Sequence, residues 1–192
     1  MYYLQYALVA CVSYLIGSIP FSYLIPKVTR GKDIRDHGSG NIGASNVSRV
    51  CGVQYGLAAL VLDVGKGAAA AGLAGLLGFP QVLGAAAILG HISTPFLGFS
   101  GGKGVATSIG VIAVFSWQTG LIAAGIWITL LALTRTASVS SIGALGLAPV
   151  VLRVLGIGDL RLWLTIGIFA LIIFTHRENI ARIIRGEEKT VV

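Results

Sequence analysis

The stretch from Val53 to Gly78, VQYGLAALVLDVGKGAAAAGLAGLLG, decides the fold class of this chain. It is longer than the ~20 residues that an α-helix needs to cross a bilayer. Its only charged residues are Asp63 and Lys66. Because a charge inside a membrane is costly, these two residues, three apart on one helix, are expected to neutralise each other. Structural support is the favoured role for this pair, ahead of direct catalysis.

The composition of the whole chain extends the prediction of a membrane protein. Hydrophobic residues make up 55% of the 192 positions, charged residues make up 11%, and the mean hydropathy is +0.87. A soluble domain carries roughly 25% charged residues, because its surface must stay hydrated. We therefore expect an all-α polytopic membrane protein, with residues 1–192 forming a single membrane-integral domain.

Apolar runs between polar breaks predict about seven transmembrane helices. Several of these runs are shorter than the ~20 residues of a full span. An arrangement with five spans, in which the short runs are fused or lie outside the membrane, is therefore the alternative. The seven candidate spans lie at residues 2–25, 53–78, 81–97, 104–116, 118–134, 138–155 and 160–176.

The distribution of basic residues favours seven spans. Eleven of the 14 Lys and Arg residues fall after the first, third, fifth and seventh runs, and with seven spans these places share one side of the membrane. The positive-inside rule then puts the basic segments and the C-terminus in the cytoplasm and the N-terminus outside. A net charge of +7 would suggest nucleic acid for a soluble protein. Beside apolar helices it instead predicts acidic membrane lipids and anionic substrates as partners, and no nucleic acid.

The first basic segment, residues 38–52, has the sequence GSGNIGASNVSRVCG. It contains G-x-G-x-x-G, but a dinucleotide site requires a preceding β-strand, and an apolar helix and a charged linker precede it here. Glycines let backbone amides turn toward an anion, and Arg49 adds a forked cation. The segment thus predicts an anion site, with a flexible polar loop as the alternative. Its neutral hydrogen-bond donors are Ser39, Asn41, Ser45 and Asn46.

The second segment, residues 90–107, has the sequence GHISTPFLGFSGGKGVAT. It is not a Walker A loop, because two of the consensus positions hold other residues. The turn Gly101–Gly104 is expected to lead into a helix, whose N-terminus attracts anions, and Lys103 adds a full positive charge there. Phosphate binding is therefore favoured over a plain glycine hinge. His91 is expected to be a hydrogen-bonded helix residue rather than a base.

Two further segments carry polar residues near the C-terminus. In residues 175–188, THRENIARIIRGEE, the spacing of His176 and Asn179 places both on one helix face. Residues 135–141 form a Ser/Thr-rich entry to a helix, where the hydroxyls cap the helix or Ser141 reaches an anion. Three His residues without paired ligand spacing argue against a metal site.

Together the segments resemble the signature motifs of bacterial membrane-integral glycerol-3-phosphate acyltransferases that use acyl phosphate. The matching motifs are S-G-N-I-G-A-S-N-x-x-R, G-H-x-x-x-P-F-x-x-F-x-G-G-K-G-V-A-T and H-R-E-N-I-A-R-x-x-x-G-x-E. The resemblance covers nearly the whole chain. It implies a seven-helix enzyme of the cell inner membrane with a cytoplasmic active site. This enzyme would acylate the 1-hydroxyl of glycerol 3-phosphate and release lysophosphatidic acid and phosphate, the first acylation step of phospholipid synthesis.

The resemblance also implies partners and site residues. No cofactor is implied; the substrates are acyl phosphate and glycerol 3-phosphate, and the enzyme that makes acyl phosphate is a functional link. Whether His176 or the donor's own phosphate is the base stays open, and a membrane transporter of phosphorylated small molecules is the alternative function. The candidate catalytic residues are Lys103, His176 and Ser141. The candidate substrate-binding residues are Ser39, Gly40, Asn41, Gly43, Ser45, Asn46, Arg49, Gly101, Gly102, Gly104, Thr107, Asn179 and Glu188.

Overall fold

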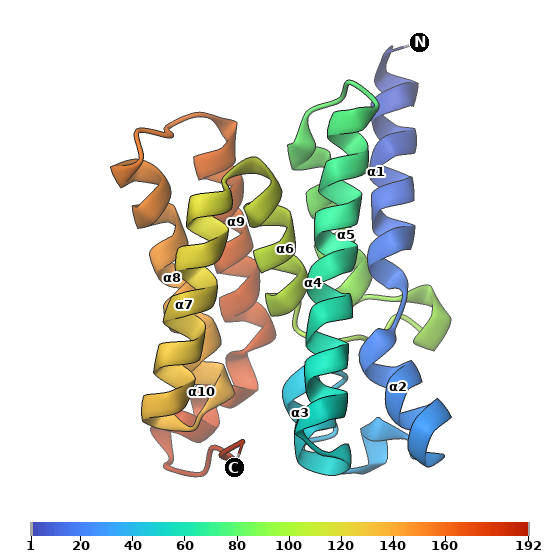
Figure 1. Cartoon of the computed structure of the whole chain (residues 1–192), viewed down its shortest axis with the longest axis vertical. Coiled ribbons are helices and arrows are strands. Elements are labelled where there is room, and N and C mark those ends of the chain that lie inside the picture. The colour runs from blue at the N-terminus through green and yellow to red at the C-terminus, as the bar shows by residue number, and fades with distance from the viewer. Residues whose placement is uncertain (1, 192) are drawn as a thin grey trace. The chain divides into compact units, whose positions relative to one another are not determined.

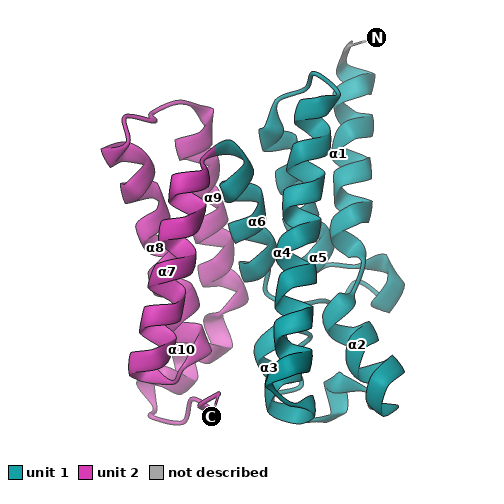
Figure 2. Ribbon diagram, viewed as in Figure 1, with its two compact units in different colours: residues 1–115 teal, residues 116–192 magenta. Residues whose placement is uncertain are grey.

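The computed structural model describes residues 2–191, which form helices joined by turns and contain no strand (Figure 1). Contacts divide the chain into two compact units, Met1–Phe115 and Ser116–Val192 (Figure 2). The expected all-α class is therefore confirmed for the described residues.

The first unit is organised around one long helix, α4. Small residues let other helices pack closely on it. A Cβ atom added at Gly67 of α4 would overlap the carbonyl oxygen of Thr107 on α6, and one added at Gly84 would overlap the α4 backbone at Ala71. The elements of this unit are α1 (Tyr2–Ser18), α2 (Phe21–Arg30), η1 (Ile34–Asp36), α3 (Ala44–Cys51), α4 (Val53–Leu76), η2 (Gln81–Ala85), α5 (Ala86–Ile92), η3 (Pro95–Leu97) and α6 (Val105–Phe115).

The first membrane span is interrupted between α1 and α2. Pro20 has no backbone N–H, so it interrupts the ladder of helical hydrogen bonds. In a membrane, the carbonyl groups released by such a break need partners inside the protein. Thr94 Oγ1 donates to the carbonyl oxygen of Ser18 at 2.7 Å, and Lys66 Nζ donates to that of Ile19 at 2.8 Å. Both carbonyls are thus satisfied, and α1 and α2 together form one candidate span.

In the part of the second unit that the structure describes, the chain forms four helices, α7 to α10. The turn between α7 and α8 contains Arg135 in the left-handed conformation, with φ of 54°. At the other end of the unit, Asp159 caps α9 by accepting a hydrogen bond from the backbone N–H of Arg161. Helices α9 and α10 meet at His176 with a bend of 61°. The bounds are α7 (Trp117–Thr134), α8 (Ala137–Val154), α9 (Leu160–Thr175) and α10 (Arg177–Ile184).

The long helices expose large apolar side chains, as a lipid solvent requires. Leu57 and Val61 of α4 are 55% and 66% exposed, and Trp163 of α9 is 67% exposed. Within the described residues, four helical stretches are long and apolar enough to cross a membrane, and α9 with α10 makes a fifth. The runs expected at 81–97 and 104–116 are helical but short or broken. The count of seven spans therefore stays a prediction, while the multi-helix membrane fold is confirmed.

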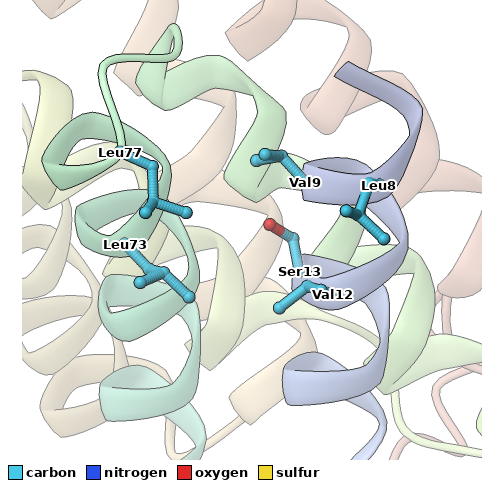
Figure 3. A pocket seen from close by; sticks show the side chains of 6 residues that line it. All are labelled: Leu8, Val9, Val12, Ser13, Leu73 and Leu77. Atoms are coloured by element: carbon cyan, nitrogen blue, oxygen red, sulfur yellow. The ribbon is translucent and has the colours of Figure 1, made fainter. Parts of the chain in front are cut away.

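An apolar pocket of about 100 Å³ lies between α1 and α4 (Figure 3). Its lining residue Leu73 lies in the last turn of α4 and Leu77 directly follows that helix, whereas α3 adjoins the N-terminal end of α4. A helix rises 1.5 Å per residue, so roughly 30 Å of helix separates Val53 from Leu73. The pocket is therefore distinct from the first glycine-rich segment. The other lining residues are Leu8, Val9, Val12 and Ser13.

Candidate functional site

The loop before α3 is organised by the side chain of Asn46, which is only 2% exposed. Its Oδ1 accepts a hydrogen bond from the backbone N–H of Ser39 at 2.8 Å. Its Nδ2 faces three carbonyl oxygens, those of Ile34 at 3.2 Å, His37 at 3.0 Å and Asn41 at 3.1 Å. Both polar atoms of the amide group therefore form hydrogen bonds with the loop itself. This geometry indicates that Asn46 shapes the loop, although the sequence suggested it as a residue that binds substrate.

Glycines are required at two positions of the same loop. Gly38 and Gly40 have φ of 64° and 72°, in the left-handed region that favours glycine. A Cβ at Gly38 would also overlap Oδ1 of Asn46, and one at Gly40 would lie 3.1 Å from the carbonyl oxygen of Arg35. The loop then enters α3 through Gly43, the N-cap residue. These constraints favour a fixed loop over the flexible polar loop that was the alternative.

The remaining polar residues of the first segment lie on or beside α3. Ser45 and Arg49 are four residues apart on this helix and share a face. Arg49 Nη1 donates to Oδ1 of Asn46 at 3.4 Å, which ties the guanidinium to the loop. Ser39 is exposed and Asn41 is half-buried. The segment thus places one cation beside several neutral donors at the start of a helix.

The second glycine-rich segment packs directly against the first. The backbone N–H of Gly102 donates to the carbonyl oxygen of His91 at 3.0 Å. A Cβ at Gly102 would overlap the carbonyl oxygen of Ile42, so the two backbones approach as closely as glycine allows. Leu97 packs against the apolar cluster that contains Ile42 and Val47. Within the first unit, the structure therefore brings the two predicted anion-binding segments together.

The turn before α6 carries the other candidates of the second segment. Lys103 is half-buried, and Gly104 has φ of 87° just before the helix begins. In the first turn of α6, Thr107 is fully buried and its Oγ1 has no hydrogen-bond partner in the described residues. Leaving a buried hydroxyl without a partner costs about 1–3 kcal/mol. A buried polar group in this position calls for an explanation, of which a functional role is one.

In the second unit, Glu188 connects α8 with α10. Its Oε1 accepts hydrogen bonds from Ser138 and Asn179, and its Oε2 pairs with Nε of Arg182 at 2.8 Å. Burial alone would raise the pKa of Glu188. The hydrogen bonds from Asn179, Ser138 and Arg182 outweigh burial, so the pKa lies below its ordinary value. The charged carboxylate of Glu188 therefore attaches the segment after α10 to both α8 and α10.

We expect Glu188→Gln to lower the midpoint of thermal denaturation in detergent at neutral pH, by the equivalent of about 1–3 kcal/mol. A carboxylate with a depressed pKa stabilises the fold above its ordinary value of 4.5, and this contribution is lost as the pH falls through the lower folded value. The gap between wild type and variant should thus be constant from pH 5 to pH 8 and shrink below pH 4.5.

The neighbouring Glu187 supplies a matched control. Its ion pair with Arg185 is more than half exposed on both sides, and such pairs contribute little. Glu187→Gln should therefore leave the midpoint unchanged. Equal effects of the two variants, or a gap that widens in acid, would contradict the role given to Glu188.

Ser141 and His176 are oriented by hydrogen bonds within their own unit. Ser141 Oγ donates to the carbonyl oxygen of Ala137 at 2.7 Å and accepts from Trp127 Nε1 at 3.1 Å. His176 is 3% exposed, and its Nδ1 lies 2.8 Å from the carbonyl oxygen of Ile172. Only an Nδ1–H can donate to a carbonyl, so in the neutral ring the lone pair resides on Nε2.

The sequence-predicted residues fall into two groups, one in each unit. In the first unit the two glycine-rich segments meet at Gly102 and Ile42, and in the second unit Asn179 is hydrogen-bonded to Glu188. Sequence reasoning missed three residues that support them. Ser138 and Arg182 lie in segments singled out for other reasons, whereas nothing in the sequence marked Trp127. The first unit holds Ser39, Gly40, Asn41, Gly43, Ser45, Asn46, Arg49, Gly101, Gly102, Lys103, Gly104 and Thr107. The second holds Ser141, His176, Asn179 and Glu188.

Known proteins similar to this chain share one description. Residues 7–186 match the family model for glycerol-3-phosphate acyltransferase. A glycerol-3-phosphate acyltransferase of Desulforudis audaxviator is 43% identical over 184 residues, which cover 94% of this chain and 93% of the relative. A protein of the same name from Jannaschia sp. is 41% identical over 187 residues, covering 96% and 92%.

Solved structures are similar as well. A crystal structure of PlsY (YgiH), described as an integral membrane glycerol 3-phosphate acyltransferase in its glycerol 3-phosphate form, matches with a TM-score of 0.90. It is 38% identical, and the match covers 97% of this chain and 95% of that chain. The lysophosphatidic acid form of the same protein matches with a TM-score of 0.88 at 37% identity.

Proposed function

Because this chain belongs to the glycerol-3-phosphate acyltransferase family, we propose that it takes its acyl group from acyl phosphate. Membership of this family means acyl transfer to glycerol 3-phosphate by a multi-pass membrane protein, which decides against the transporter alternative. We propose in addition the donor, lysophosphatidic acid as the product, and the roles of the residues. Its main support is the close packing of Gly102 on Ile42, which joins two glycine-rich segments that carry Arg49 and Lys103.

The proposed reaction is nucleophilic attack on an activated carbonyl group. The oxygen of the 1-hydroxyl of glycerol 3-phosphate bonds to the carbonyl carbon of acyl phosphate. The bond from that carbon to the bridging oxygen then breaks, and the phosphate leaves with the electron pair. The hydroxyl proton ends on the released phosphate or on a protein base. The products are lysophosphatidic acid and inorganic phosphate, and no cofactor enters the balance.

The first unit supplies the groups that a phosphorylated donor requires. Arg49 and Lys103 would bind phosphate, and the amides of 38–43 and 101–102 would cradle it, because oriented N–H groups and cations are the usual partners of phosphate oxygens. Neutral donors near the carbonyl would stabilise the oxyanion that forms during attack, where one well-aimed donor is worth roughly 10²–10³ in rate. These neutral donors are Ser39, Asn41 and Ser45.

The second unit supplies the groups for glycerol 3-phosphate. We assign Ser141, His176 and Asn179 to this substrate, because their hydroxyl, imidazole and amide groups suit its hydroxyls and phosphate oxygens. Each is held in place by a hydrogen bond that the structure contains: Ser141 by Trp127, His176 by the carbonyl of Ile172, and Asn179 by Glu188. Asn46 and Glu188 would then act by positioning loops rather than by touching substrate.

We favour the donor's own phosphate as the base, because acyl phosphate is already activated. On this account His176→Ala raises KM for glycerol 3-phosphate by about 10-fold, the worth of a hydrogen bond to a charged group, and the pH–rate profile keeps its shape. The measurement is kcat/KM for glycerol 3-phosphate from pH 5 to pH 9. If the variant lost a limb near pH 6–7, where histidine titrates, His176 would be the base instead.

We further propose that the protein lies in the cell inner membrane, with its N-terminus outside and its basic segments in the cytoplasm. The support is the positive-inside rule applied to the runs of basic residues. A cytoplasmic site also suits two water-soluble phosphate headgroups, while the acyl chain stays in lipid. The enzyme that makes acyl phosphate would act just before this one, since the donor has to be formed before it is used.

The donor can be identified with the purified full-length protein. Glycerol 3-phosphate is offered with acyl phosphate, acyl-CoA or acyl carrier protein thioester, and lysophosphatidic acid is measured. We expect product with acyl phosphate alone. Product with a thioester at a comparable rate would contradict the proposed donor. Uptake of labelled glycerol 3-phosphate into vesicles without any product would contradict acyl transfer itself.

A further inference from the structure

A buried group of charged and polar side chains lies between α2, α4 and α5 in the first unit. Asp63, Lys66 and His91 are 1%, 4% and 7% exposed. Asp63 Oδ1 lies 2.9 Å from Lys66 Nζ and 3.6 Å from His91 Nδ1. Asp63 Oδ2 accepts a hydrogen bond from Ser22 Oγ at 2.7 Å. One carboxylate thus faces a lysine, a histidine and a serine from three different helices.

Structural support explains part of this group. Lys66 Nζ donates to the carbonyl oxygen of Ile19, where the first span is interrupted, and Asp63 balances the charge of Lys66. An ion pair inside a membrane has to be neutral as a whole, and these contacts achieve that. Neither contact needs His91. A histidine buried against an ion pair that is already balanced therefore calls for another reason.

The other side of His91 faces the glycine-rich turn. Its carbonyl oxygen accepts a hydrogen bond from the backbone N–H of Gly102. A Cβ at Gly102 would overlap Nε2 of the His91 ring, and a Cβ at Gly101 would overlap the His91 carbonyl oxygen. The ring therefore lies directly beneath the turn that leads to Lys103. Its Nδ1 edge faces Asp63, and its Nε2 edge faces Gly102.

We infer that His91 is a positioning residue, held by Asp63, that sets the conformation of the turn Gly101–Gly104 and so the place of its amides and of Lys103. The carboxylate fixes the rotation of the imidazole, because only one ring orientation puts Nδ1 beside it. The fixed ring then supports Gly102 from below. Packed interiors transmit small shifts, so a ring free to turn would displace the backbone above it. This inference rests on the proposed role of that turn in phosphate binding.

His91→Phe distinguishes the effect of the polar contact with Asp63 from the effect of packing against Gly102. Phenylalanine keeps a ring beneath Gly102 but has no nitrogen to face Asp63. We expect KM for acyl phosphate to rise about 10-fold when the 3.6 Å polar contact with Asp63 is lost, with kcat changed less than threefold. The shift of the denaturation midpoint caused by inorganic phosphate should be lost in parallel. A role in stability alone would lower the midpoint and leave KM unchanged.

Two comparisons complete the test. Asp63→Asn should also raise KM for acyl phosphate. In the double variant, KM should be no higher than in the more affected of the two single variants, because both changes break the same coupling. Thr165→Val is the control: it removes a buried hydrogen bond to the carbonyl of Arg161 in the second unit and should leave KM unchanged. If His91→Phe does not fold, Asp63→Asn alone is decisive, with a raised KM expected.

The outcomes separate this inference from the proposed function. If the wild type forms lysophosphatidic acid from acyl phosphate and both single variants keep its KM within twofold, His91 does not position the turn. Additive increases of KM in the double variant, or an equal rise in Thr165→Val, would also overturn the coupling. A wild type that uses no acyl phosphate would overturn the proposed function and this inference with it.

Discussion

Lys103→Ala should reduce acyl transfer from acyl phosphate by at least about 10²–10³-fold, the usual loss when a group that stabilises developing charge is removed. Lys103 is half-buried in the turn that enters α6, and the first turn of this helix holds the buried Thr107, whose hydroxyl has no hydrogen-bond partner among the described residues. A cation at a helix N-terminus stabilises the leaving phosphate, and alanine leaves only the backbone amides there. The measurement is the rate of lysophosphatidic acid formation at saturating substrates.

Two variants control for charge and fold. Lys32→Ala removes an exposed cation of the same unit and should keep its activity, since exposed charges are screened. Lys103→Arg retains the charge in a different geometry and should keep part of the rate. Turnover by Lys103→Ala close to that of the wild type would remove Lys103 from the phosphate site.

Asn46→Asp should abolish activity and lower the denaturation midpoint by several degrees. The change keeps the size of the side chain but replaces its amide group with a carboxylate. This carboxylate would face the carbonyl oxygens of Ile34, His37 and Asn41, which now accept from Nδ2. Acceptor facing acceptor in a buried place costs about 1–3 kcal/mol or more. The loop of the first segment should therefore lose its conformation, as seen by thermal denaturation and by activity.

Gln54→Glu is the matched control for this variant. It makes the same chemical change a short distance along the chain, at an exposed position in the first turn of α4. Because the side chain of Gln54 is exposed, water hydrates the new carboxylate, and activity and stability should be retained. An Asn46→Asp protein with the stability of wild type would show that the loop does not depend on this amide.

The sequence predicted the fold class because lipid imposes a simple requirement. Long apolar runs such as 53–78 and 118–134 have no other stable form in a membrane than helices, and the structure has α4 and α7 at these places. The expected pairing of Asp63 with Lys66 is confirmed at 2.9 Å.

Helix length was harder to predict than helix position. The run 81–97 contains Gly84 and Pro95 and is divided into η2, α5 and η3, rather than forming one straight span. Pro20 likewise divides the first run, and the side chains of Lys66 and Thr94 donate hydrogen bonds to the carbonyl groups at the break. Hydropathy records how apolar a segment is, but not whether distant side chains satisfy its backbone. The number of spans depends on such tertiary contacts.

Candidate site residues could be chosen from the sequence, but the contacts that each of them makes could not. The pattern of Ser39 to Arg49 marked Asn46 as one donor among several, yet its contacts make it the centre of the loop. Glu188 was placed with the substrate, and its contacts show a link between α8 and α10. A hydrogen bond between residues 50 positions apart, such as that of Ser138 with Glu188, leaves no local signal in a sequence.

The most direct test of the account measures phosphate and lysophosphatidic acid in one reaction of the purified protein with acyl phosphate and glycerol 3-phosphate. Acyl transfer from acyl phosphate predicts that both products form in equal amounts, that neither forms without glycerol 3-phosphate, and that Lys103→Ala stops both together. Release of phosphate without lysophosphatidic acid, or formation of lysophosphatidic acid without release of phosphate, would contradict the account.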